Sequence, residues 1–136
     1  MSSDLTWLLT RNSNSFLVKR NGVVLSREPG NLRNLHSFKY SGFAPTKTVD
    51  VSAGAKGVVV TLSKTKNASK VSASKTVVPL TGSTRASAKS VKALLSNYRP
   101  DLTAAALARV SRINESQKPP KPVRAKAARR NRAKKL

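Results

Sequence analysis

The stretch Lys47-Thr-Val-Asp-Val-Ser-Ala-Gly-Ala-Lys-Gly-Val-Val-Val-Thr-Leu62 decides the fold class. Residues 47–52 alternate apolar and polar side chains, which is the period of a strand with one buried face. Residues 53–57 contain two glycines and turn the chain. Residues 58–62 are almost continuously apolar, as expected of a central strand. The stretch predicts two adjacent antiparallel strands.

Further strand patterns lie on both sides of this pair. Residues 15–26 place two β-rich runs around Asn21-Gly22, which is typical of a type I′ hairpin turn. Residues 37–43 alternate aromatic and polar side chains and predict a half-buried strand. Residues 76–80 predict a short edge strand, because Pro79 cannot donate a ladder hydrogen bond. These runs together predict a small antiparallel sheet.

Three helices are expected besides the sheet. Residues 4–10 predict a short helix with Ser2 or Ser3 as its N-cap. A helical period begins at residue 84, and Pro100 opens another helix that extends to about residue 117. Each of these two helices has one apolar stripe. The stripe of the helix that begins at residue 84 comprises Ala88, Val91, Leu94 and Leu95, and that of the helix after Pro100 comprises Leu102, Ala106, Val110 and Ile113.

The fold class is therefore α+β, with one domain over residues 1–117 and a basic extended tail over residues 118–136. Residues 63–75 are small, polar and basic without any period, and predict a flexible insert. The insert and the tail contain few large aliphatic side chains to offset the cost of ordering them. We expect both to be disordered in the free protein and ordered on a nucleic acid.

The charge balance points to an anionic partner. The 136 residues include 27 Lys and Arg against five Asp and Glu, a formal net charge of +22. Such self-repulsion is relieved when a partner supplies anions. No apolar run approaches the roughly 18 residues of a spanning helix, and the first ten residues lack the positive region of a secretory signal. Absence of Cys agrees with a reducing compartment.

Catalytic and metal-binding chemistry is not expected. His36 is the one histidine, Cys is absent, and the five acids are widely spaced, which leaves no general-base pair, thiol nucleophile or metal-ligand cluster. Gly54 and Gly57 lack the ending of a phosphate-binding loop. We predict no enzyme, no cofactor and no small-molecule substrate.

Basic residues without acids favour RNA as the partner. Residues 118–136 carry nine Lys or Arg and no acid, and a similar acid-free distribution extends over residues 64–92. A nuclear localisation signal needs only one short cluster, so the wider distribution favours phosphate binding, although both roles are compatible. Phe16, Phe38 and Tyr40 could stack on bases, but aromatics alternating with polar residues are more often core residues, as is Trp7.

The order of several short motifs resembles the eukaryotic large-subunit ribosomal protein family L-twenty-eight. The motifs cover residues 7–60 and 98–119 in family order, whereas residues 61–83 depart from it and the tail agrees in composition only. They are Trp7 with Arg11-Asn12 and Ser15-Phe-Leu-Val-Lys-Arg20, Glu28-Pro29 with Asn31-Leu32, Ser37-Phe-Lys-Tyr40 with Gly42, Lys47-Thr-Val49, Lys56-Gly-Val-Val-Val60, Tyr98-Arg-Pro-Asp-Leu102 and Ser116-Gln-Lys-Pro119.

The resemblance implies a structural protein that binds ribosomal RNA beside other proteins of the large subunit. It implies a cytoplasmic ribosome location with nucleolar transit, no membrane contact and no homo-oligomer. Among matching basic positions it adds Arg11, Lys19, Arg20 and Arg99. The residues predicted to bind RNA are Arg11, Lys19, Arg20, Lys39, Lys64, Lys66, Lys70, Arg85, Lys89, Lys92, Arg99, Lys118, Lys121, Arg124, Lys126, Arg129, Arg130, Arg132, Lys134 and Lys135.

Two alternatives stay open at this point. A nucleolar assembly factor shares the domain but continues into a longer acidic region. A chromatin protein such as a linker histone also joins a small fold to a Lys, Ala and Pro tail. The hairpin around Asn21-Gly22 and the alternating strands argue against the chromatin alternative, because the fold of a linker histone is mostly helical.

Overall fold

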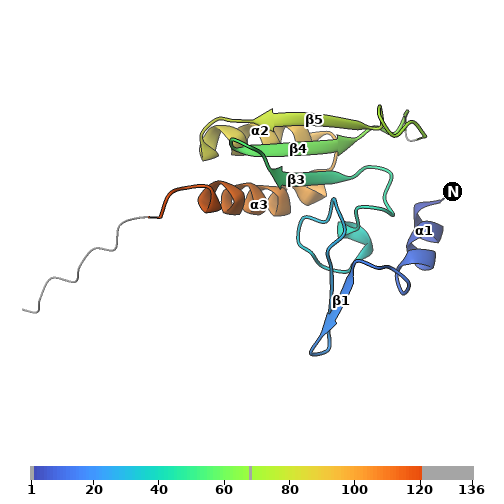
Figure 1. Ribbon diagram of the computed structural model, residues 1–136. Helices are drawn as coiled ribbons and strands as arrows, with labels where there is room; N and C mark the ends of the chain where they lie inside the picture. Colours follow the sequence, from blue (N-terminus) through green and yellow to red (C-terminus); the bar gives the residue numbers. More distant parts are fainter. Residues whose placement is uncertain (1, 68, 121–136) are drawn as a thin grey trace, which may run out of the picture.

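Three antiparallel strands form the central sheet of the protein in a computed structural model that describes residues 2–67 and 69–120 (Figure 1). They are β3 (Val49–Ala53), β4 (Val58–Ser63) and β5 (Lys75–Leu80), in the order β3-β4-β5. The predicted central position of residues 58–62 and the predicted edge position of the strand with Pro79 are both confirmed.

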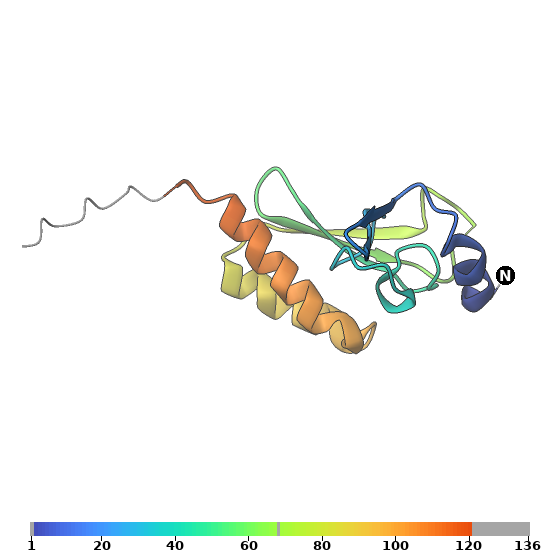
Figure 2. The ribbon, with the colours of Figure 1, turned by 90° about the horizontal axis from the view of Figure 1, so that it is seen from below.

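Two helices cover one face of this sheet, as Figure 2 shows. They are α2 (Thr84–Ser96), capped by Ser83, and α3 (Thr103–Ser116), preceded by the short 3-10 helix η2 (Pro100–Leu102). The predicted stripes face the sheet, because valines at alternate positions of β3 and β4 pack against them in one fully buried core. That core comprises Val49, Val51, Val58, Val60, Val91, Leu95, Ala106 and Val110.

A separate hairpin projects from the body below the sheet in Figure 1. Its strands, β1 (Leu17–Arg20) and β2 (Val23–Ser26), pair with each other, and Leu25 adds one isolated bridge to Leu35. Asn21 and Gly22 have φ of 47° and 76°, which confirms the predicted type I′ turn. The α+β class is confirmed, but the expected single sheet is two sheets.

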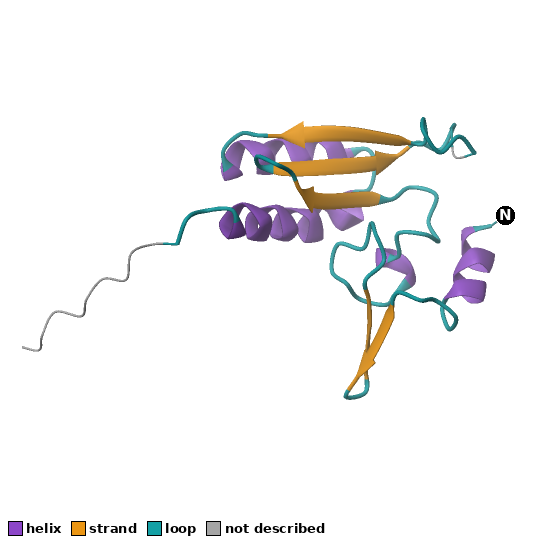
Figure 3. Ribbon diagram, viewed as in Figure 1, coloured by secondary structure: helices purple, strands orange, loops and turns teal. Residues whose placement is uncertain are grey.

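The strand predicted over residues 37–43 is wrong. The chain from β2 to β3 is loop apart from the 3-10 helix η1 (Phe38–Tyr40), as Figure 3 shows. Its backbone bonds are local, with the Ser41 N–H donating to the carbonyl of Ser37 at 3.0 Å, because no neighbouring strand offers a ladder. Phe38 and Tyr40 consequently leave the shared face that a strand would give them: Phe38 contacts Trp7, and Tyr40 packs against the core.

A buried carboxylate organises this loop. The Glu28 side chain accepts hydrogen bonds from Asn31 Nδ2 and from Ser41 Oγ, each at 3.2 Å, and all three residues are at most 5% exposed. Gly42 closes against Pro29 so tightly that an added Cβ would overlap the Pro29 carbonyl oxygen. Only glycine permits that approach of two backbones.

The N-terminal helix α1 (Ser3–Thr10) has its leucine side chains exposed to solvent. Ser2 caps it, as one of the two predicted caps, by accepting a hydrogen bond from the Leu5 N–H at 3.2 Å. Trp7 holds it to the loop through His36, with ring centroids 4.9 Å apart. Leu5, Leu8 and Leu9 point outward, with exposed fractions of 47%, 59% and 63%. Trp7 is thus an anchor of α1 and lies outside the main core.

The predicted insert is a loop between β4 and β5, shorter by one residue at each end. Ser63 and Lys75 belong to the strands, where they pair with each other. Val71, the one large aliphatic side chain of the insert, is 88% exposed. The disorder expected of the free insert stays a prediction, and the tail beyond residue 120 lies outside the described residues.

Candidate nucleic-acid interface

The predicted RNA-binding residues lie at separate places on the surface. Within the described part of the chain all of them are exposed except Arg99. Lys19 and Arg20 lie at the end of the β1–β2 hairpin, and Lys64, Lys66 and Lys70 lie in the β4–β5 loop. The structure therefore distributes these cations over several surfaces. Lys121, Arg124, Lys126, Arg129, Arg130, Arg132, Lys134 and Lys135 lie outside the described residues.

Helix α2 presents one continuous row of cations. Arg85, Lys89 and Lys92 are spaced by four and three residues, so they occupy one side of the helix. All three are exposed, while Val91 and Leu95 on the other side are fully buried. Helix α2 therefore has a packing face and, opposite to it, a cationic face.

Arg99 uses its guanidinium inside the protein. Nε and Nη2 donate to the two carboxylate oxygens of Asp101 at 2.9 and 2.7 Å, and further bonds reach the carbonyls of Lys39 and Lys47. The hydrogen bond from Arg99 lowers the pKa of the Asp101 carboxyl below its ordinary value, and the charges of Arg99 and Lys39 act in the same direction. With 16% of its side chain exposed, Arg99 connects the η1 loop to η2. Its RNA contact stays a prediction.

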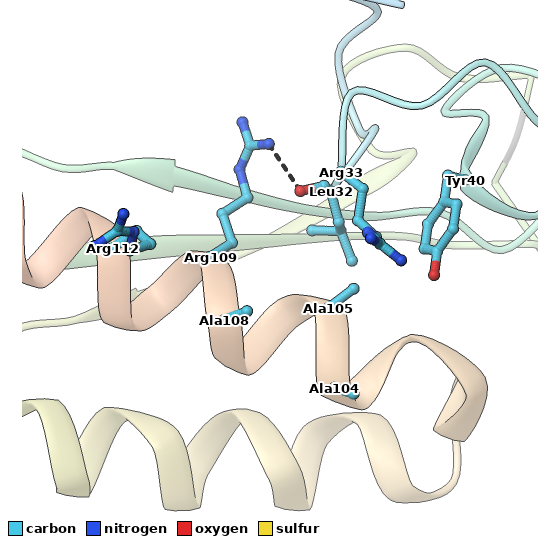
Figure 4. Close-up of a pocket in the computed structure, with 8 residues that line it drawn as sticks. All are labelled: Leu32, Arg33, Tyr40, Ala104, Ala105, Ala108, Arg109 and Arg112. Atoms are coloured by element: carbon cyan, nitrogen blue, oxygen red, sulfur yellow. Dashed lines mark hydrogen bonds between the residues drawn. The ribbon is translucent and has the colours of Figure 1, made fainter. Parts of the chain in front are cut away.

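A groove of about 470 Å³ lies between α3 and the loop that precedes η1. We call it the α3 groove, and Figure 4 shows its side chains. Small alanines on one side of α3 leave the space, since a longer side chain there would fill it. Its lining residues are Leu32, Arg33, Tyr40, Ala104, Ala105, Ala108, Arg109 and Arg112.

Arg109 fixes the geometry of the α3 groove. Its Nε donates to the Val51 carbonyl at 2.8 Å, and Nη1 donates to the carbonyls of Asn31 and Leu32 at 3.0 and 3.1 Å. The side chain thereby ties helix α3 to strand β3 and to the loop. Figure 4 shows the guanidinium turned toward Leu32. Arg109 is a positioning residue for the wall of the groove.

The other two arginines of the groove are available to a ligand. The Arg33 guanidinium carbon lies 5.6 Å from the centroid of the Tyr40 ring, a cation–π distance. Arg112 is paired with Glu115 at 2.8 Å, but both side chains are largely exposed, at 82% and 67%. Exposed pairs of this kind contribute little and exchange readily. No carboxylate lines the groove, so it combines an apolar floor with a cationic rim.

Sequence reasoning missed Arg33, Arg109 and Arg112. For Arg109 a signal was present, because it falls between the buried positions 106 and 110 of α3 and an arginine beside such a stripe needs internal acceptors. Arg33 and Arg112 offered no such signal, since their place in one groove depends on how the loop folds onto the helix.

The stacking platform that was the less favoured interpretation of Phe16, Phe38 and Tyr40 is not formed as one surface. Phe16 pairs with Phe43 at a centroid distance of 5.6 Å, Phe38 lies beside Trp7, and Tyr40 alone lines the α3 groove. Each aromatic thus belongs to a different place on the molecule.

Metal-binding, histidine-dependent and membrane-spanning roles have little support in the described part of the chain. Residues 2–67 and 69–120 contain no cluster of three potential metal ligands. His36 stacks on Trp7, which gives it a packing role. Among the same residues no helix is long and apolar enough to cross a membrane.

Comparison with known proteins identifies the family of this chain. Residues 5–116 match the model of the Ribosomal L28e protein family. The chain belongs to the ribosomal L28e family. Its relatives include the large ribosomal subunit protein eL28 of Dictyostelium discoideum, 43% identical over 96% of this chain and all of that protein. The eL28 of Schizosaccharomyces pombe is 37% identical over 90% of this chain and 98% of its own length, and that of Trypanosoma cruzi is 34% identical over 99% and 90%.

Membership of the L28e family agrees with the resemblance drawn from the motifs. The family match also includes residues 61–83, where the motifs depart from the family. The exposed cations of the hairpin, the β4–β5 loop and α2 all lie within the matched region.

Proposed function

We propose that this L28e-family protein is a structural component of the large subunit of the cytoplasmic ribosome and binds ribosomal RNA through its exposed cations. The observation that supports the proposal most directly is similarity over whole chains to relatives named as large ribosomal subunit proteins. A net charge of +22 with exposed Lys and Arg on several surfaces fits a chain surrounded by phosphates.

The basic surfaces would act chiefly by position and charge. Phosphate contacts fix the place and orientation of a protein on a nucleic acid, whereas base contacts supply specificity. The spread of cations over hairpin, loop and helix suits contacts with several RNA segments and with neighbouring ribosomal proteins. In this role the protein is a monomeric, non-enzymatic part of the particle that passes through the nucleolus during assembly.

Sedimentation of a tagged full chain from eukaryotic cells tests the proposal. The protein should be found in large subunits, in whole ribosomes and in translating polysomes, and should crosslink there to large-subunit RNA. Restriction of the protein to nucleolar precursor particles would support the assembly-factor alternative instead. Recovery with chromatin in place of ribosomes would contradict both ribosomal roles.

A further inference from the structure

The α3 groove has the chemical character of a nucleotide site. Leu32 and the alanines of α3 form an apolar floor, Tyr40 supplies an aromatic face, and Arg33 and Arg112 supply positive charge at the rim. An apolar floor beside an aromatic ring suits a planar base, and an exposed arginine at either end of the groove suits a phosphate. The volume of about 470 Å³ lies in the usual range of small-ligand sites, roughly 300 to 1,000 Å³.

We propose that the α3 groove binds one unpaired nucleotide of RNA, with the base against Tyr40 and the alanine face of α3 and the phosphate on Arg33, which lies beside Tyr40. The inference rests on the proposed RNA-binding function and adds a specific site to it. A base in a duplex is stacked between its neighbours and is not accessible to such a groove. The ligand is therefore a nucleotide splayed from a loop, bulge or single strand.

The surroundings of the groove prepare it for this ligand. Tyr40 packs against the hydrophobic core, which holds its ring in place. Arg109 donates three hydrogen bonds to backbone carbonyls and so holds the loop wall at a set distance from α3. Arg33 already lies over the Tyr40 ring, and its planar guanidinium can stack on a base while it contacts phosphate.

Filling the groove without changing charge or fold tests the proposal. Ala108 is an exposed groove residue on α3, and Leu is nearly as good a helix former as Ala, so Ala108→Leu should obstruct the floor and leave the fold intact. The matched control is Ala93→Leu at an exposed position of α2 outside the groove. Circular dichroism and melting temperature should be the same for both variants.

Binding of the full chain to two RNA probes gives the readout. The probes are single-stranded oligo-uridine and an RNA duplex, at raised salt, which weakens phosphate contacts more than stacking. Ala108→Leu should weaken oligo-uridine binding about tenfold, the effect of losing one stacked base. Duplex binding should not change, and Ala93→Leu should match the wild type on both probes.

A second pair of variants examines the aromatic face. Tyr40→Phe keeps the ring and should retain the affinity for oligo-uridine, whereas Tyr40→Leu removes the ring and should reduce that affinity about as much as Ala108→Leu. Wild-type binding that Ala108→Leu leaves unchanged would overturn the groove site alone. Failure of the wild type to bind either RNA would overturn the proposed RNA-binding function together with it.

Discussion

At the scale of single residues, Glu28 is the most consequential acid of a chain that has only five. It is 5% exposed, and no Lys or Arg of the described residues lies within salt-bridge distance of it. Its oxygens instead accept from Asn31 and Ser41. Since those donors are themselves buried, the carboxylate serves to satisfy them and thereby to hold the loop on which Tyr40 depends.

Removing that acceptor should be costly. Glu28→Ala leaves the buried Ser41 hydroxyl without its acceptor and removes one of the two acceptors of the Asn31 amide, whose other bond is to the Leu35 carbonyl. It should lower the free energy of unfolding by about 1 to 3 kcal/mol, measured by urea denaturation. Glu28→Gln keeps one acceptor oxygen and should lose less. Glu115→Ala, at a largely exposed acid, serves as the control and should be close to neutral. A Glu28→Ala protein as stable as the control would contradict this role.

The pair Arg99 and Asp101 should make stability depend on pH. Because the hydrogen bond from Arg99 lowers the pKa of Asp101 in the folded protein, the ionised carboxylate stabilises the fold at pH values above its unfolded pKa of about 3.9. This contribution is lost as the pH falls through the lower, folded pKa. Wild type should therefore exceed Asp101→Asn in urea stability at neutral pH, and the gap should narrow in strong acid. A gap that is constant with pH would contradict the assignment.

At the scale of elements, α1 is held chiefly by the aromatic contacts of Trp7. The helix has no buried residue, and its contact with the rest of the protein centres on Trp7 against His36 and Phe38. Trp7→Ala should therefore release α1 and speed amide hydrogen exchange in residues 3–10. Leu8→Ser at the 59% exposed position should leave that exchange nearly unchanged and alter stability by less than about 0.5 kcal/mol. Equal effects of both substitutions would show that the leucine face contacts the protein.

Elements whose partners are near in sequence were predictable. The hairpin, the β3–β4 pair and the stripes of α2 and α3 follow from local periodicity, and the structure confirms them. Residues 37–43 were not predictable in the same way, because alternation describes which faces a strand would have and does not reveal whether another strand lies beside it. The α3 groove was missed for a related reason, since the loop with Arg33 and the helix with Arg112 come to line one groove only through tertiary packing.

At the scale of the whole molecule, cations surround a small neutral core. The buried residues of the sheet and the two helices are almost all apolar, whereas the Lys and Arg of the hairpin, the β4–β5 loop and α2 are exposed. The fold can therefore form without RNA, and the RNA contacts that we propose involve side chains that contribute little to folding. Substitutions in the two sets should separate cleanly into effects on stability and effects on binding.

Removing the basic tail should change the salt dependence of RNA binding more than its sequence preference. Residues 119–136 carry eight Lys or Arg, and each phosphate contact contributes roughly 0.7 to 0.9 to the slope of log affinity against log salt. A chain that ends at residue 118 should therefore show a flatter slope for oligo-uridine and for duplex alike, since phosphates are common to both. The loss should scale with the number of cations removed, so truncation after residue 127 should give an intermediate slope. Thermal unfolding should be unaffected, because the core lies within residues 32–110. An unchanged slope would show that the phosphate contacts reside on the folded domain.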